Sequence, residues 1–390
     1  MTHRISAAER ATFKGCRRRW DFSSSNRMNL EPVAGPPEIS VERAVKDALA
    51  IYYFPGMWDW PRAVVLPLVT KGFERSMLDQ RNRSSSGDPL SPEEEQRWRK
   101  GLIDGRRLLD EYVTWAPSAD RFGPVLVESE FVAPVASPHS DTDGLVTESG
   151  DAVHYHGRID ALVVDQFDAY WILRHRVVDR WTPIEQLRLD EESIAACWAW
   201  ENFYLGMTIT GTIDNEVRFA SENGGLIPGG SQVGESDPEF QPPPATGRVA
   251  QHAASGGGRS VPQHRRLSAR SREPDSAPRV EEHFGPGFRR AWIRRRRSET
   301  AAAVIRLSHE ATLMIEPTVM AYPNPSPEQC QRCRFVQPCL TMNDGSDPAP
   351  ILADHYHQVP AAPEGEHRLG SATWSIGRGA APPQFGPKGQ

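Results

Sequence analysis

Hydrophobic residues recur at helical spacing in several parts of the chain. Ser6 and Glu9 form a capping-box pair, which predicts the start of a first helix. Within it, Phe13, Cys16 and Trp20 recur at helical spacing and are expected to share one face. The same spacing predicts four more helices, at 41–53, 91–115, 190–205 and 298–315.

Between 125 and 219 the hydrophobic period shortens to the alternation that is typical of strands. Strands are predicted at 125–135, 155–165, 169–178 and 208–219, with a turn-rich loop at 138–151. Helices followed by a strand meander, a helix and a further strand indicate an α/β fold of the mixed α+β kind. We therefore expect a central mixed sheet flanked by helices.

Both periods disappear in two segments. Residues 221–287 contain runs of Gly and of Pro with many Ser and Arg residues, which predicts a disordered Arg/Pro/Gly-rich insertion. Residues 347–390 are again rich in Pro and Gly and are predicted to form a disordered tail. The folded domain is then expected to consist of 1–220 together with 288–346, which would complete the same domain after the insertion.

The chain has 390 residues and a formal net charge of −6. It has no apolar run of membrane-spanning length, and its first residues lack the apolar core of a secretory signal, so a cytoplasmic protein without membrane contacts is expected. Between 246 and 300, thirteen arginines stand against five acidic residues. This basic arm, which includes Arg289, Arg290 and 294–297, suits phosphate binding, with Trp292 available to stack on bases. A charged linker is the alternative interpretation.

Four of the five cysteines form a pattern that is typical of metal binding. Cys330 and Cys333 are separated by two residues, Cys339 follows after five more, and Cys16 lies near the other end of the chain. Four thiolates satisfy either a tetrahedral zinc ion or an iron–sulfur cluster, and composition does not separate the two. Cys197 lies among tryptophans and is predicted to be a core residue.

Together with two predicted strands, these cysteines resemble a known family. A helix with Cys16, a strand reading Gly157-Arg158-Ile159-Asp160, a following strand and a terminal C-x2-C-x5-C pattern resemble the iron–sulfur RecB-like, AddB-type nucleases of the PD-(D/E)XK superfamily. The resemblance implies a restriction-endonuclease-like core. It also implies that the four cysteines hold a [4Fe–4S] cluster, which joins the two ends of the chain.

The resemblance also assigns the catalytic positions of the family, and most of them are substituted. Asp160 matches the first metal-binding carboxylate. Arg174 and Arg176 stand where the next strand would carry a carboxylate and a lysine, and Lys46 stands where an early helix would carry a histidine. Mg²⁺, which needs several oxygen ligands, is therefore a doubtful cofactor.

Residues two apart on a strand point to one face, so Arg174 and Arg176 are expected to face Asp160 together. Arginine does not deprotonate, and a unit charge pair about 4 Å apart is worth roughly 4 kcal/mol at an effective dielectric near 20. We therefore expect an ion pair between Asp160 and one arginine. As alternatives, the arginines bind phosphate or form a solvated strand face, or Glu128 or Glu130 replaces the missing metal ligand.

These features predict a DNA-binding member of this nuclease family that has lost its nuclease activity. It is expected to bind single-stranded DNA or DNA ends and to assist DNA repair, recombination or phage-related DNA metabolism, with a helicase or repair complex as partner. DNA contacts are expected from Arg17, Arg18, Arg19, Arg158 and Trp20. Two alternatives remain: an active metal-dependent DNA exonuclease with relocated ligands, and a metal-stapled structural module with no role on DNA.

Overall fold

The computed structural model describes residues 2–33, 39–58, 60–84, 90–140, 143–204, 206–219 and 279–359. Most of the predicted insertion and the predicted tail from 360 onward lie outside these residues. Among the helices of the described ranges, none combines the length and the apolar character that a membrane crossing requires.

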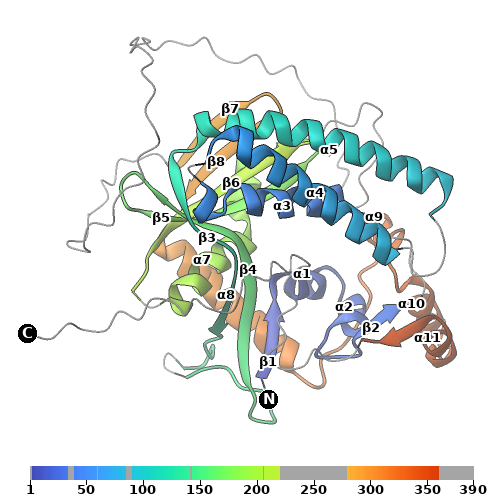
Figure 1. The fold of residues 1–390 in the computed structure, drawn as a ribbon. Coiled ribbons are helices and arrows are strands. Elements are labelled where there is room, and N and C mark those ends of the chain that lie inside the picture. Colours follow the sequence, from blue (N-terminus) through green and yellow to red (C-terminus); the bar gives the residue numbers. More distant parts are fainter. Residues whose placement is uncertain are drawn as a thin grey trace, which may run out of the picture. The chain divides into compact units, whose positions relative to one another are not determined.

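A mixed seven-stranded sheet lies at the centre of the fold, which confirms the predicted mixed sheet (Figure 1). Its strands are β1 (Thr2–Ser6), β3 (Phe122–Pro134), β4 (Ala152–Asp165), β5 (Tyr170–Val178), β6 (Ile209–Arg218), β7 (Val280–Gly285) and β8 (Phe288–Arg294). Their order is β1-β4-β5-β6-β8-β7, and β3 also pairs with β4. The pairs β1–β4 and β5–β6 are parallel, and the other pairs are antiparallel.

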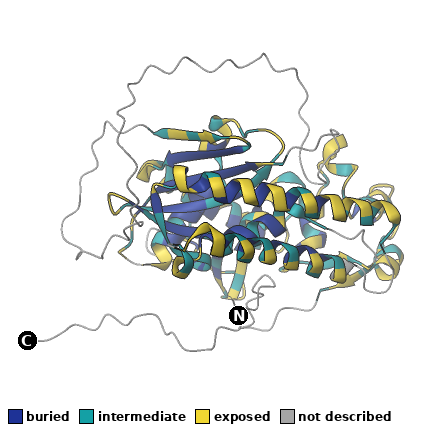
Figure 2. Cartoon of the chain, turned by 45° about the horizontal axis from the view of Figure 1, so that its top comes forward, coloured by how far each residue is buried: buried dark blue, intermediate teal, exposed yellow. Residues whose placement is uncertain are grey.

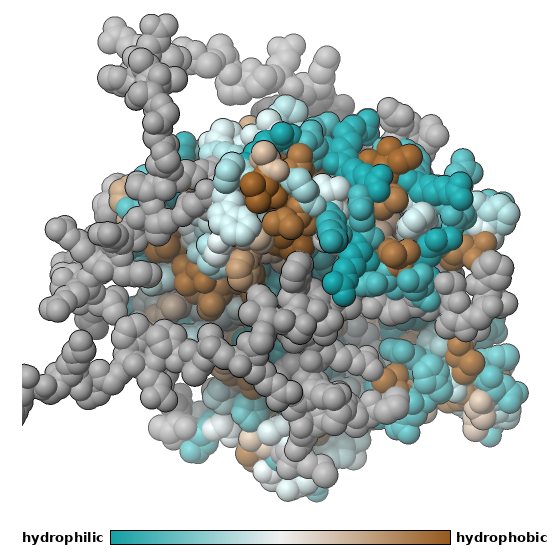
Figure 3. Space-filling view, viewed as in Figure 1, coloured by the Kyte–Doolittle hydropathy of each residue, from teal (hydrophilic) through white to brown (hydrophobic). Residues whose placement is uncertain are grey.

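Helices cover both faces of this sheet (Figure 1). One face is covered by α3 (Val41–Tyr52), α4 (Arg62–Ser84) and α5 (Pro92–Ala119), and the other by α7 (Glu191–Phe203) and α8 (Arg297–Ile315). Strand residues are buried between these layers, while the outer sides of the long helices are exposed (Figure 2). On the face seen in Figure 3, α4 and α5 present mainly hydrophilic residues interrupted by small hydrophobic patches.

The remaining elements are shorter. They are α1 (Ala7–Gly15), α2 (Arg17–Ser23), η1 (Pro55–Met57), α6 (Ile184–Leu189), α9 (Pro327–Cys330), α10 (Val336–Asn343), α11 (Ala349–His355), β2 (Leu30–Pro32) and β9 (Tyr356–Gln358). The elements α2, β2 and α9 to α11 lie together beside the sheet, so that they bring the two ends of the described chain side by side (Figure 1).

The helix predicted after Ser6 is shorter than expected. Ser6 accepts the backbone N–H of Glu9 at 3.2 Å and caps α1, as predicted. The helix ends at Cys16, whose backbone is extended (φ −158°, ψ 110°), and α2 begins after it. The prediction that Phe13, Cys16 and Trp20 share one helical face is therefore wrong, because Cys16 lies at a break between two helices.

The sequence pattern does not predict α4, although it is 23 residues long. Pro67 and Gly72 lie within it, and such residues usually mark the end of a helix. Close packing explains this glycine, because a Cβ on Gly72 would stand 2.2 Å from Cδ1 of Ile51 on α3. Tertiary packing therefore overrides the local signals here.

Both predicted disordered segments are too wide. The strand β7 begins at Val280, inside the predicted insertion, and pairs with β8. At the other end, β9 pairs with β2, and the backbone N–H of Val33 donates to the carbonyl of His355 at 2.8 Å. The compact unit runs to Val359, so residues 347–359 belong to the folded domain rather than to a tail.

Polar side chains cross the middle of the sheet in two rows. The register aligns Arg176, Glu216 and Arg289 in one row and His175, Asn215 and Arg290 in the other. Because successive residues of a strand point to opposite faces, each row lies on its own face of the sheet. The predicted basic arm is therefore wrong at Arg289 and Arg290, which are 4% and 0% exposed.

Arg290 is buried with its counter-charge on the side of α3 and α5. Its guanidinium forms an ion pair with Asp120, whose side chain is 1% exposed. It also donates to the hydroxyl of Tyr53, to that of Tyr112 at 2.8 Å and to Asn215 Oδ1 at 3.3 Å. A buried charge needs such partners, so this cluster fixes β8 against the helices.

We predict that Arg290→Met lowers the free energy of unfolding by about 3–5 kcal/mol, because it leaves the Asp120 carboxylate buried without a counter-charge. Urea denaturation followed by circular dichroism measures this change. Arg97→Met, at an exposed arginine of α5, is the control and should stay within about 0.5 kcal/mol of the wild type. A loss below about 1 kcal/mol in Arg290→Met would contradict the role given to this pair.

Candidate functional site

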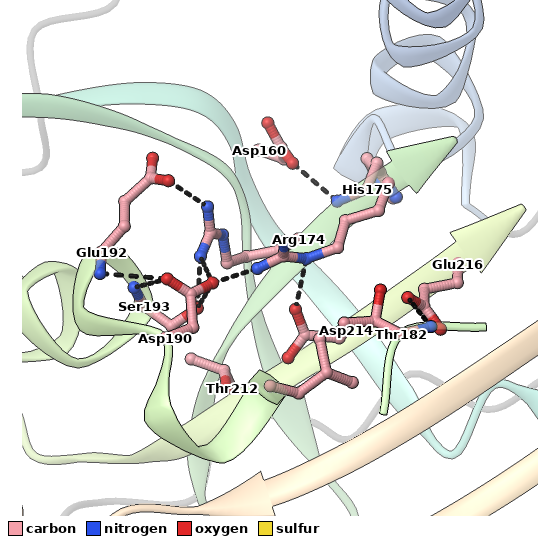
Figure 4. A network of polar contacts seen from close by, with 12 residues as sticks. Asp160, Arg174, His175, Thr182, Asp190, Glu192, Ser193, Thr212, Asp214 and Glu216 are labelled. Carbon is pink, nitrogen blue, oxygen red and sulfur yellow. Dashed lines mark hydrogen bonds and ion pairs between the residues drawn. The ribbon is translucent and has the colours of Figure 1, made fainter. Parts of the chain in front are cut away.

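The strands β4 and β5 separate at the centre of the candidate site. Their ladder joins 161–164 to 170–173, and β5 continues beyond it, paired with β6. Asp160 lies just outside this ladder, and its Oδ2 accepts the backbone N–H of His175 at 2.6 Å (Figure 4). The carboxylate therefore bridges the two strands where their backbone ladder ends.

Arg174 (Figure 4) and Arg176 are held by carboxylates of the chain itself. The guanidinium of Arg174 lies 2.8 Å from Asp190 Oδ2 and 2.9 Å from Glu192 Oε2. The Nε of Arg176 lies 2.8 Å from Asp214 Oδ1, and its Nη2 pairs with Asp190. We call these five residues the arginine–carboxylate network.

The predicted ion pair between Asp160 and an arginine is wrong. Among the described residues, Arg174 and Arg176 take their ion-pair partners from the network, and Asp160 binds a backbone N–H instead. The solvated strand face is also wrong, because the two arginine side chains are 16% and 27% exposed and that of Asp214 is 0% exposed. Phosphate binding by these arginines would have to displace their carboxylate partners.

Opposite charges keep the network ionised. Burial raises the pKa of Asp190, but Arg174, Arg176 and a hydrogen bond from Ser193 outweigh this effect and lower the pKa to about 2. Burial lowers the pKa of Arg174, but the attraction of four surrounding carboxylates outweighs it and raises the pKa above its ordinary value. The network sets two arginines against three carboxylates, so each arginine has more than one counter-charge beside it.

The network also contains Asp190 and Asp214, which the sequence pattern did not single out. Asp190 is also the N-cap of α7, where its Oδ1 accepts the backbone N–H of Glu192 at 3.1 Å. Asp214, Asn215 and Glu216 are consecutive in β6, and each is 0% exposed. Consecutive polar residues inside a central strand need buried partners, and this was the signal that could have pointed to the network.

Further predicted residues surround Asp160. Glu128 has a left-handed backbone (φ 47°), and its carboxylate lies 3.3 Å from the guanidinium of Arg158. Burial raises the pKa of Glu128, Arg158 lowers it, and Asp47 and Asp160 raise it further. Lys46 makes an ion pair within α3. Even so, among the residues that the structure describes, no three Cys, His, Asp or Glu side chains form a group that could hold a metal ion.

The four cysteines of the predicted metal site line one cavity of about 190 Å³. Cys16 comes from the break between α1 and α2, Cys330 from the end of α9, Cys333 from the turn that follows, and Cys339 from α10. All four are free thiols. Cys197 is instead buried in α7, which confirms that it is a core residue.

Direct contacts also join the two chain ends around this cavity. Arg18 Nη1 donates to the carbonyl of Cys339 at 3.3 Å. The side-chain amide of Asn324 donates to the carbonyl of Gly15 at 2.8 Å, and its backbone N–H lies 3.5 Å from Cys16 Sγ. The cavity is therefore held in place by hydrogen bonds between its own walls.

The predicted DNA-binding residues differ in their accessibility. Trp20 is 1% exposed and packs edge-on against Phe13, and Trp292 is 8% exposed. The prediction that these indoles stack on bases is therefore wrong. The guanidinium of Arg17 lies 4.8 Å from the ring centroid of Phe13, whereas Arg19 is exposed beside the cavity.

No family model matches this chain, and no curated protein matches it. A solved structure, described as the crystal structure of SSO0001, is similar to it with a TM-score of 0.25 and 10% sequence identity. The similarity covers 78% of this chain and 86% of that chain. At this level the likeness assigns neither a family nor a function.

The titration of His175 gives a test of the surroundings of Asp160. Burial lowers the pKa of His175 to about 4. In the unfolded chain the imidazole binds a proton below about pH 6.5, while the folded protein does not until about pH 4. Proton binding by the unfolded chain therefore lowers the free energy of unfolding as the pH falls from about 6.5 to about 4. Above about pH 6.5 this loss is absent.

We predict that His175→Phe flattens the pH dependence of stability in this window. The ring stacking on Tyr53 is retained in this variant, while the titrating group is removed. Urea unfolding at several pH values measures the slope. The control His309→Phe, at an exposed histidine of α8, should keep the wild-type slope. If His175→Phe also keeps that slope, another group is responsible and the assignment is wrong.

Proposed function

We propose that this protein binds DNA and an iron–sulfur cluster but does not cleave DNA. It would be a PD-(D/E)XK-like protein with a replaced nuclease site, accessory to DNA repair, recombination or phage-related DNA metabolism. The observation that carries the proposal is the arginine–carboxylate network, in which Arg174 and Arg176 occupy the strand beside Asp160. By the resemblance, these are the positions at which the family would carry a metal-binding carboxylate and a lysine.

The residues present at this site do not fit Mg²⁺, which needs near-octahedral oxygen ligands. The carboxylates of Asp190 and Asp214 are bound to arginines, and Asp160 Oδ2 is bound to a backbone N–H. A cation here would displace Arg174 or Arg176 from its partners, and breaking a buried pair costs about 3–5 kcal/mol. The network's own carboxylates already offset the repulsion expected from the arginines. The obstacle to Mg²⁺ is therefore the shortage of free ligands.

Glu128 is the residue that favours the second candidate function, an active exonuclease with relocated ligands. Burial raises the pKa of Glu128, and the neighbouring acids Asp47 and Asp160 raise it further. Carboxylates that share a site without a counter-ion show such a shift. Arg158 already neutralises Glu128 at 3.3 Å, which is why we place this function second.

We assign an iron–sulfur cluster rather than a zinc ion to the cysteine cavity because the one-plus-three cysteine pattern resembles that of the RecB-like family. A zinc ion would need all four Sγ atoms about 2.3 Å from one point. In a [4Fe–4S] cluster each cysteine binds a different iron, so the thiols stand around a larger volume, such as this cavity of about 190 Å³. Held by Cys16, Cys330, Cys333 and Cys339, the cluster would link the two chain ends covalently.

Exposed arginines near the cysteine cavity support DNA binding. Arg19 lines the cavity, and Arg332 lies between two of the cysteines in the sequence. Both side chains are exposed. Arginines of this kind bind phosphate without regard to sequence, and the affinity falls as salt rises. A structural module without a role on DNA would show no such binding.

We predict that the protein, purified without oxygen, contains about four iron atoms and four sulfide ions per chain. Cys16→Ser and Cys330→Ser should each lose most of this iron, because each removes a ligand from a different end of the chain. Iron and acid-labile sulfide analysis measures the loss. Cys197→Ser is the matched control and should keep the full iron content. Stoichiometric zinc in place of iron would contradict the cluster.

We predict that single-stranded DNA binds without being cleaved in the presence of Mg²⁺ or Mn²⁺. Fluorescence anisotropy should show binding that weakens with salt, and gel electrophoresis should show intact DNA. Arg19→Gln combined with Arg332→Gln should reduce the slope of log affinity against log salt by about 1 to 2. Metal-dependent cleavage that disappears in Asp160→Ala would instead establish the active exonuclease. If no DNA binds even at low salt, the result would favour the metal-stapled structural module without a role on DNA.

A further inference from the structure

The loop after β5 presents an aromatic side chain from a fixed position. Trp181 lies in this loop, next to Thr182. The backbone N–H of Thr182 donates to Glu216 Oε1 at 3.2 Å, and its carbonyl accepts a hydrogen bond from Arg289. Both partners belong to one of the two polar rows of the sheet. The loop is therefore anchored through both backbone polar groups of Thr182.

A second aromatic ring lies beside this loop on the edge strand β7. The ring centroids of Phe284 and Trp181 are 6.3 Å apart, and their planes meet at 73°. Phe284 is 60% exposed. Its backbone is in register with Arg289, so Phe284 extends the row that begins at Arg176 and passes through Glu216. The exposed ring therefore lies on the same face of the sheet as the arginine–carboxylate network.

Arg218, beside the ring of Trp181, and Arg180, its neighbour in sequence, have no carboxylate partner among the described residues. Arg218 lies 5.5 Å from the ring centroid of Trp181, and Arg180 precedes Trp181 in the loop. Both arginines are exposed. By contrast, the guanidinium of Arg289, also near Trp181, is neutralised by Glu216. The two exposed arginines therefore offer positive charge beside an exposed ring.

We propose that Arg180, Trp181, Arg218 and Phe284 form a stacking platform for single-stranded DNA. A base would stack on the exposed ring of Phe284, while Arg180 and Arg218 contact the neighbouring phosphates. Trp181 supports the ring from the anchored loop. This inference rests on the proposed DNA binding and names a second contact surface for it, on the sheet rather than at the cysteine cavity.

The test compares two oligonucleotides of equal length and charge, oligo-dT and an abasic strand. Fluorescence anisotropy with the full-length chain measures both affinities. Phe284→Ala should weaken oligo-dT binding roughly 5- to 100-fold and leave the abasic strand nearly unchanged, because only bases stack. Arg218→Gln should weaken the binding of both oligonucleotides and reduce its salt dependence.

The matched control is Phe167→Ala, which removes a phenylalanine that is even more exposed (75%) from the turn between β4 and β5. It should bind both strands like the wild type. Phe284→Tyr keeps an aromatic ring and should restore binding, which separates stacking from a folding defect. Asp179→Asn, which removes an exposed acid from the loop after β5, should tighten the binding of both oligonucleotides.

Equal affinities of the wild type and Phe284→Ala for oligo-dT would overturn the platform while leaving DNA binding in place. Tighter binding by Phe284→Ala would also overturn it, since another part of the chain would then cover the ring. A wild type that binds neither strand at low salt would overturn the proposed function itself, and with it this inference.

Discussion

Charged side chains on β5, β6 and β8 find their partners only when these strands pair in one register. The alignment of Arg176, Glu216 and Arg289 places opposite charges next to one another on one face of the sheet. A slip by one residue would turn each of these side chains to the opposite face. The polar rows thus fix the register of the central strands, and the same register positions the candidate site and the loop that carries Trp181.

The same pairing determines what the site can do. Arg176 is held by Asp214 from the neighbouring strand, while Asp190 brings in the N-terminus of α7. Each carboxylate of the network is already paired with an arginine, so a cation would have to compete with these ion pairs. The proposed roles on DNA therefore lie outside the network, at the cysteine cavity and at the exposed ring of Phe284.

Much of the fold could be predicted from hydrophobic periods and helix caps. The alternation between 125 and 219 matches β3 to β6 closely, and α5 begins after Ser91 as expected, with Ser91 and Glu94 forming a capping box. The strands β7 and β8 were harder to find, because Arg289 and Arg290 are typical of a basic linker until a buried acid is placed opposite each. Trp20 was misassigned for a similar reason, since the sequence alone does not show which indole is buried.

The candidate site was predictable in its positions but not in its partners. The strand spacing correctly placed Arg174 and Arg176 on one face, yet their counter-ions, Asp190 and Asp214, come from a helix cap and from a parallel strand. Such long-range pairs depend on register and on helix placement, which local patterns do not encode. The convergence of Cys16 with the three C-terminal cysteines depends in the same way on how the chain ends meet.

The central claim is that the arginine–carboxylate network leaves no free metal site, and Mn²⁺ binding tests it most directly. Electron paramagnetic resonance during a Mn²⁺ titration separates free from bound ion. The account predicts that the wild type binds no stoichiometric Mn²⁺ at Asp160, so that wild type and Asp160→Ala give the same free-ion signal. One bound Mn²⁺ per chain that disappears in Asp160→Ala would contradict the account.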